Sequence, residues 1–218
     1  MRLKLTIILT LLTPTIVWGQ IDSTEQTVKN RTRNLVWFTP SSAKRINGIA
    51  IGLTAMPVKI EEQEINGINV EVGIFGLFAV PYTVVGSLIA PFKSDTLEQE
   101  AGVLMRKNIY QIDSPIEETI NGVSISALGH LGSGETNGLS VNGFVLSANK
   151  VDGLSIAGLL NLTYDFTGVK IGLLRNKTTK GKGLMVGLFN NCKDCKGVQL
   201  GLLNRIGKRT YPLINVRL

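Results

Sequence analysis

The stretch Val169-Lys170-Ile171-Gly172-Leu173-Leu174-Arg175-Asn176 decides the fold, because close copies of it return along the chain. Two of the copies are Leu184-Met185-Val186-Gly187-Leu188-Phe189-Asn190 and Val198-Gln199-Leu200-Gly201-Leu202-Leu203-Asn204. The glycines that open six such phrases lie at positions 122, 138, 153, 168, 183 and 197, so the steps are 16, 15, 15, 15 and 14 residues. Glycine at a fixed period indicates stacked repeats, in which the backbone turns or approaches itself closely.

The residues of each copy alternate in character. In a strand, successive side chains face opposite sides. One side would hold only aliphatic residues, namely Val169, Ile171, Leu173 and their equivalents, and the other would hold Lys170, Gly172 and theirs. We expect the aliphatic side to be buried against protein or lipid.

Two all-β architectures are compatible with this repeat. In a β-solenoid or β-roll of ~15-residue repeats, each period is one coil and equivalent residues stack. The asparagines of one row could then hydrogen-bond along the stack; they are Asn161, Asn176, Asn190 and Asn204. In an antiparallel sheet or a small outer-membrane β-barrel, each period is one strand and one polar loop, and the aliphatic side faces lipid. The few aromatic residues, 6% of the chain, favour the solenoid, whose six regular coils would stack to about 29 Å.

The repeat also sets the domain organisation. Earlier copies at Ile46–Leu53 and Ile65–Val72 place one repeat domain at 46–218, interrupted by an irregular apolar and charged insertion at about 73–118. Within it, Val72–Phe92 carries no formal charge but contains prolines and glycines, which favours a buried or membrane-contacting excursion over a span. Residues 20–45 are expected to form a flexible arm, in which Leu35–Phe38 is a first strand or a docking segment.

The N-terminal segment predicts export. Arg2 and Lys4 precede an apolar run from Leu5 to Val17, and a cleavage point before Gln20 would make residues 1–19 a signal peptide. The apolar run is too short for a transmembrane anchor. We therefore expect the chain in the periplasm, in the outer membrane or at the cell surface.

The chain is basic, with a formal net charge of +7. A basic balance can indicate nucleic-acid binding. No aromatic stacking platform is interleaved with the lysines, and an exported protein rarely meets nucleic acid. The charge therefore favours a solvated face, or contact with an anionic lipid or glycan.

Two cysteines, Cys192 and Cys195, are the only ones in the chain. A C-x-x-C pair can carry redox chemistry in a thioredoxin-like setting. Here the pair lies in a loop between repeat strands, no helix is expected after it, and two cysteines are too few for a closed zinc site. We expect a local disulfide or two unreactive thiols.

No catalytic arrangement is evident. The only histidine, His130, lies near Ser133 and Glu135 in a glycine-rich turn without a nucleophile-elbow pattern, so we expect a surface loop histidine. The adjacent carboxylates Glu117 and Glu118 lie in a charged linker and are expected to be solvated. The sequence thus predicts no enzyme and no catalytic, cofactor or metal-binding residue.

The repeat phrase, the two Ile-Asn-Gly-Ile copies, the leader and the closing Tyr211–Val216 resemble the exported surface-repeat proteins of Gram-negative bacteria, especially Bacteroidota, over roughly residues 46–218. That family has no assigned activity, so the resemblance implies only an exported, envelope-associated protein. The sequence predicts a non-catalytic envelope or surface protein with a structural or binding role. Its partner would be an envelope protein, a glycan or a lipid surface. The alternative is an integral outer-membrane β-barrel with a channel or scaffold role.

Overall fold

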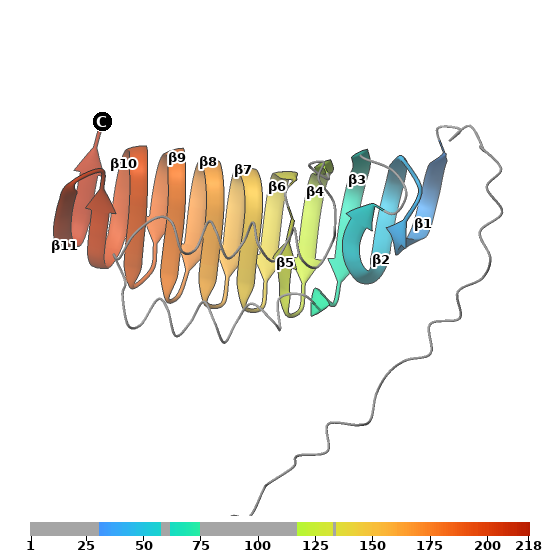
Figure 1. Ribbon diagram of the computed structural model, residues 1–218, viewed down its shortest axis with the longest axis horizontal. Coiled ribbons are helices and arrows are strands. Elements are labelled where there is room, and N and C mark those ends of the chain that lie inside the picture. Colours follow the sequence, from blue (N-terminus) through green and yellow to red (C-terminus); the bar gives the residue numbers. More distant parts are fainter. Residues whose placement is uncertain (1–30, 58–61, 75–116, 133) are drawn as a thin grey trace, which may run out of the picture.

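The chain folds as a parallel β-solenoid of about eight turns, seen side-on in Figure 1. The computed structural model describes residues 31–57, 62–74, 117–132 and 134–218. The strands are β1 Thr32–Ser41, β2 Arg45–Pro57, β3 Glu62–Glu71, β4 Glu117–Ser126, β5 Gly129–Leu131, β6 Glu135–Asn142, β7 Val145–Ala157, β8 Leu160–Gly172, β9 Arg175–Val186, β10 Phe189–Ile206 and β11 Arg209–Arg217.

The strands stack almost in sequence order. Ten of them follow one another as β1-β2-β3-β4-β6-β7-β8-β9-β10-β11, and the short β5 pairs with β7. Every described pair is parallel except β10 with β11. The solenoid expectation is therefore confirmed, and the antiparallel alternative is wrong for these strands.

The glycine period fixes the register. In β2 to β10 the repeat glycines lie directly opposite one another, for example Gly138 opposite Gly153 and Gly153 opposite Gly168. Each has a positive φ, which is 132° at Gly153, and a Cβ there would lie 2.1 Å from the carbonyl oxygen of Gly138. Because only glycine adopts this conformation without strain and leaves this space free, the glycine column sets the corner of every coil.

Each long strand turns at its glycine and so contributes to two sides of the coil. In β8, Phe166 precedes the corner glycine and is buried at 2% exposure, while Lys170 follows it and is also buried. Between and beyond them Val169, Ile171 and Leu173 face outward. The aliphatic side of the repeat is therefore the outside of the solenoid, and the expectation that it would be buried is wrong within this chain.

The inward column after the corner glycines is mostly small or polar. From β2 to β7 it holds Ala50, Asn69, Ser124, Ser140 and Ser155, and from β8 to β10 it continues with Lys170, Met185 and Gln199, all of them buried. The opposing inward column is mainly apolar and holds Ile46, Ile65, Ile120, Thr136, Val151 and Phe166. Where the inward residues are Ala or Ser, the two walls of the coil can approach each other closely.

The interior adjusts where one rung holds a larger side chain. Phe166 lies opposite Gly181 in the register of β8 and β9. A Cβ at Gly181 would lie 2.2 Å from the Phe166 ring, so the missing side chain leaves the space that the ring fills. Burial of a phenylalanine side chain stabilises the fold by roughly 1.5–3 kcal/mol.

The N-terminal end of the solenoid begins earlier than the sequence indicated. Residues Thr32–Ser41 form β1, which pairs in parallel with β2, so the repeat domain starts at Thr32 and not at Ile46. Trp37 of β1 packs against the interior, and its Nε1 donates to Ser41 Oγ at 2.9 Å. The expected signal peptide at 1–19 lies outside the described residues. So do residues 20–30 of the expected arm at 20–45 and residues 75–116 of the expected insertion at about 73–118. Within the described ranges, no helix has the length and apolarity needed to cross a membrane.

Candidate functional site

The outward positions after the corner glycines form a continuous apolar surface, which we call the aliphatic face. It consists of two full columns that cross ten strands and a shorter third column. The first column is Val36, Ile49, Ile68, Val123, Leu139, Leu154, Val169, Leu184, Val198 and Val216, and the second is Phe38, Ile51, Val70, Ile125, Val141, Ile156, Ile171, Val186, Leu200 and Ile214. The third includes Leu53, Val72, Leu173, Leu188 and Leu202.

The exposure of these side chains is greatest towards the two ends of the face, where Ile51, Ile125 and Ile214 are 41%, 42% and 58% exposed. In the third column, Leu173 and Leu202 are 66% and 54% exposed. From β6 to β10 the residues of the two full columns are partly buried. The two full columns contain no formally charged residue. Monomeric soluble proteins rarely expose a contiguous apolar patch larger than a few hundred Å², and larger patches mark interaction sites.

Polar residues border the aliphatic face on the side of the corner glycines. In the N-terminal half this border is a ladder of five asparagines, Asn34, Asn47, Asn66, Asn121 and Asn137. From Asn47 onwards, the side-chain Nδ2 of each donates to Oδ1 of the preceding one, over 3.1, 3.2, 2.8 and 2.9 Å in that order. Towards the C-terminus the border becomes charged, first with Asp152 and then with Lys182 and Lys196. The border is thus neutral over much of the face and basic at one end.

Charged residues lie just before this border and pair with one another. Lys150 Nζ is 2.8 Å from Asp152 and 4.0 Å from Glu135, and the hydrogen bond to Asp152 raises the pKa of Lys150. Arg45 Nε lies 2.7 Å from Glu64, which lowers the pKa of that carboxyl. A shallow groove at Arg45 and Glu64 is therefore already neutralised, and it offers no excess charge to a ligand.

Polar ladders also run through the interior. Asn176 Nδ2 donates to Asn190 Oδ1, and Asn190 Nδ2 donates to Asn204 Oδ1, each over 2.7 Å. The same amides reach backbone carbonyls at the coil corner, such as Val186 O at 2.7 Å from Asn176. The predicted hydrogen bonding along the asparagine row is confirmed for these three residues. The fourth, Asn161, donates instead to Ser155 Oγ at 3.1 Å and to Ile171 O at 3.3 Å.

His130 is buried between two carboxylates. Its Nδ1 lies 2.8 Å from Glu71 Oε1 and its Nε2 lies 2.7 Å from Glu118 Oε1. The expectations of a surface histidine and of a solvated Glu118 are wrong, because β5 carries His130 into the interior and Glu118 takes an inward position of β4. Glu71 was missed by sequence reasoning, although its inward place in the alternation of β3 was a usable signal.

The electrostatics of this cluster favour an imidazolium. Burial disfavours the charged ring, but Glu118 and Glu71 outweigh it and raise the pKa of His130 well above its usual value. Burial likewise opposes ionisation of Glu71, yet the pKa of that carboxyl is lowered by His130 and by the backbone N–H of Ala55. Both ring nitrogens are engaged and the side chains have little exposure, so the cluster presents neither a free base nor a metal ligand. In the described part of the chain, no group of His, Cys, Asp and Glu is placed to hold a metal ion.

Lys170 is a second buried base, also missed from the sequence, with a different environment. Its Nζ donates to Thr163 Oγ1 at 2.6 Å and to the carbonyl oxygen of Lys177 at 2.8 Å. It also lies 5.6 Å from the centroid of the Phe166 ring. Burial lowers the pKa of Lys170 well below its usual value. The amine is enclosed, so it joins neighbouring coils and does not reach a substrate.

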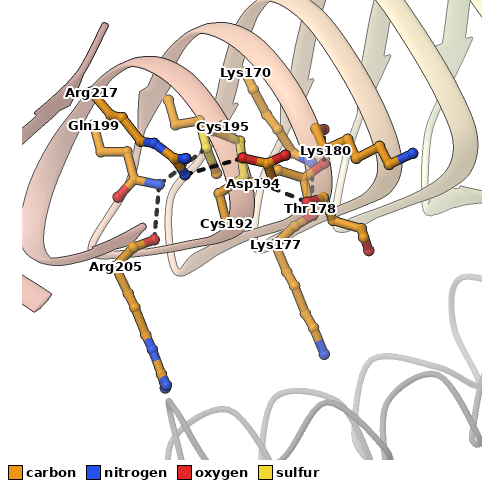
Figure 2. Close-up of a disulfide and its surroundings, with 12 residues drawn as sticks. Lys170, Lys177, Thr178, Lys180, Cys192, Asp194, Cys195, Gln199, Arg205 and Arg217 are labelled. Atoms are coloured by element: carbon orange, nitrogen blue, oxygen red, sulfur yellow. Dashed lines mark hydrogen bonds and ion pairs between the residues drawn. A yellow bond between two sulfur atoms is a disulfide. The ribbon is translucent and has the colours of Figure 1, made fainter. Parts of the chain in front are cut away.

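Cys192 and Cys195 form a disulfide inside the last coil, as Figure 2 shows. The two Cα atoms are 5.8 Å apart, and both residues are buried, at 0% and 4% exposure. Between them Asp194 points outward and its Oδ1 lies 3.1 Å from Arg217 Nη1 of β11. The disulfide and this ion pair brace the coil on which β11 closes the solenoid.

Comparison of the chain with protein-family models, curated proteins and solved structures found no match.

Proposed function

We propose that this chain is a non-catalytic, exported protein of the Gram-negative envelope, which serves as a rigid scaffold and binds an apolar partner through the aliphatic face. The observation that carries the proposal is the exposure of that face. The solenoid leaves twenty aliphatic or aromatic side chains in two columns partly or largely exposed, and covering them would remove a large apolar area from water.

The buried ionisable groups support the non-catalytic part of the proposal. His130 and Lys170 are enclosed, and each is engaged by groups of its own or neighbouring coils. They connect coils in a parallel stack whose rungs contact their neighbours, an arrangement suited to a rigid display surface. The disulfide and the N-terminal leader support export, because disulfides persist in oxidising compartments. The resemblance to exported surface-repeat proteins points to the same location.

The test uses the full chain with its own leader, expressed in a Gram-negative host, and a pair of variants. The variant Val141→Lys/Ile156→Glu places one positive and one negative side chain on the aliphatic face without changing the net charge. The two residues lie opposite each other in β6 and β7. Asn149→Lys/Tyr164→Glu places the same pair on exposed positions of β7 and β8 outside that face. We expect the wild type and the control to migrate in non-denaturing envelope extracts as a complex larger than the single chain, and the face variant to migrate as the single chain. Equal migration of the two variants would contradict a binding role for the face.

A further inference from the structure

The size of the aliphatic face matches one half of a protein dimer interface. Each residue on a sheet face occupies about 4.8 Å by 6.8 Å. The two full columns and the five residues of the third column therefore cover about 800 Å², which is close to what each partner contributes to a standard stable protein interface. A single small ligand would cover only part of such a surface.

The chemistry of the face and its border indicates protein more than lipid. Helices and surfaces that bind anionic membranes combine apolar residues with a rim of Lys and Arg and with interfacial Trp. Here the neutral ladder from Asn34 to Asn137 borders the N-terminal half, and only Lys182 and Lys196 make the C-terminal border basic. An apolar centre with a polar, mostly uncharged rim is the composition of a homodimer interface.

The spacing of the face adds a geometric argument. The corner glycines hold the side chains of successive strands in exact register, such as Leu139, Leu154 and Val169 in one column. A second copy presents the same period, so rows of one face can fit between rows of the other over their whole length. Two sheets packed face to face lie about 10 Å apart with their side chains interdigitated.

From these observations we propose that the aliphatic face is the interface of a homodimer, in which two copies pack face to face. The contact is isologous, because the same surface is used by both copies and the assembly closes at two. This inference rests on the proposed binding role of the face and names its occupant.

Sedimentation velocity of the purified full-length chain over a dilution series tests the proposal. We expect a species of twice the chain mass at micromolar concentration. Val141→Lys/Ile156→Glu should weaken self-association at least about 100-fold, because it places charges in a desolvated contact. Asn149→Lys/Tyr164→Glu, on the same two coils away from the face, should dimerise like the wild type.

A milder variant keeps the test informative if the charged variant unfolds. Leu154→Ala/Ile156→Ala removes apolar side-chain area from the face without adding charge. It should raise the dissociation constant of the dimer about 10-fold and leave the far-ultraviolet circular dichroism unchanged. Loss of association in the control as strongly as in the face variants would overturn the proposal.

Other occupants give distinct results. A wild-type monomer that co-sediments with vesicles of phosphatidylethanolamine and phosphatidylglycerol would assign the face to lipid. A monomer that dimerises only after deletion of residues 75–92 would assign it to that segment of the chain. Either result would overturn the dimer, while loss of the larger complex in envelope extracts, confined to the face variant, would still support the binding role proposed above.

Discussion

The two sides of the sheet that follows the corner glycines are opposite in character, and the polar side is the inner one. Inside, Lys170 and the serines of the earlier coils find partners within their own or a neighbouring coil. Outside, Ile171 and its equivalents are left partly exposed. The inward side chains therefore join neighbouring coils, whereas the outward side chains are available for contact with a partner.

The difference shows that polarity alone does not place a side chain. A buried polar group costs less when it is hydrogen-bonded, and parallel stacking places partners one coil away: the side-chain amides of Asn176 and Asn190 both donate to the next asparagine of the row. An exposed aliphatic column costs the monomer little, since β-branched residues suit a pleated surface.

The largest effect is expected inside, at the carboxylate-paired histidine. His130→Ala leaves Glu71 and Glu118 buried without their cation and should lower the free energy of unfolding by about 3–5 kcal/mol. Urea denaturation measures this loss. In a Glu71→Gln/Glu118→Gln background, the same substitution should cost much less, because no uncompensated charge remains. Equal costs in both backgrounds would mean that the ion pairs do not hold these coils together.

The next largest loss of stability is expected from a cavity made in the apolar interior. Leu146 is fully buried in β7, and Leu146→Ala should destabilise the fold by about 2–5 kcal/mol through lost burial and an incompletely filled space. Thermal and urea unfolding both report it. A cost well below 1 kcal/mol would place Leu146 outside a close-packed interior.

The disulfide should contribute less, because it closes a short loop. Replacing both cysteines, as Cys192→Ala/Cys195→Ala, should lower the free energy of unfolding by about 2 kcal/mol. The comparison is made between the oxidised wild type and the double variant in urea. Identical midpoints would show that the last coil does not depend on the crosslink.

Alkaline pH should remove part of the histidine contribution. The pKa of His130 is raised in the folded state, so its stabilisation is complete below about pH 6.5 and declines as the pH rises through the folded-state pKa. The pKa of Glu71 is lowered, so its contribution is present above the unfolded value and is lost as the pH falls through the folded one. Between about pH 7 and pH 9.5, wild type should lose more stability than His130→Gln. Parallel pH profiles would contradict the charged pairing.

The smallest effect is expected outside. Leu173 is 66% exposed, and Leu173→Ala should change the free energy of unfolding of the monomer by less than about 0.5 kcal/mol. Unfolding at high dilution isolates this monomer value from self-association. A cost comparable to that of Leu146→Ala would mean that the outer column is a second core.

The repeat made the architecture predictable from sequence. A fixed glycine step and a stacked asparagine row indicated coils in register, and Asn176, Asn190 and Asn204 stack as expected. The first strand was predicted only as one of two alternatives for Leu35–Phe38, because Thr32–Ser41 lacks the repeat glycine: Leu35 takes its place opposite Gly48, with a φ of 73°.

The direction of the two sides could not be read from polarity. Size was a usable signal only in the earlier coils, where Ala50, Ser124, Ser140 and Ser155 take the inward positions; in the later coils Lys170, Met185 and Gln199 occupy the same column. The histidine cluster depends on which strand lies beside which: Glu71 and Glu118 belong to neighbouring strands separated by a long insertion. Local sequence around His130 contains neither partner, and so a loop assignment was the natural inference.

Cysteine accessibility tests the central claim, which is that the aliphatic side faces outward, most directly. In the Cys192→Ala/Cys195→Ala background, single cysteines replace Lys170, Ile171 or Leu173, and maleimide labelling is followed at nanomolar protein concentration. The account predicts that the cysteines at 171 and 173 react nearly as fast as in urea, while the cysteine at 170 is protected until the chain unfolds. Protection at 171 and 173 with rapid labelling at 170 would contradict it.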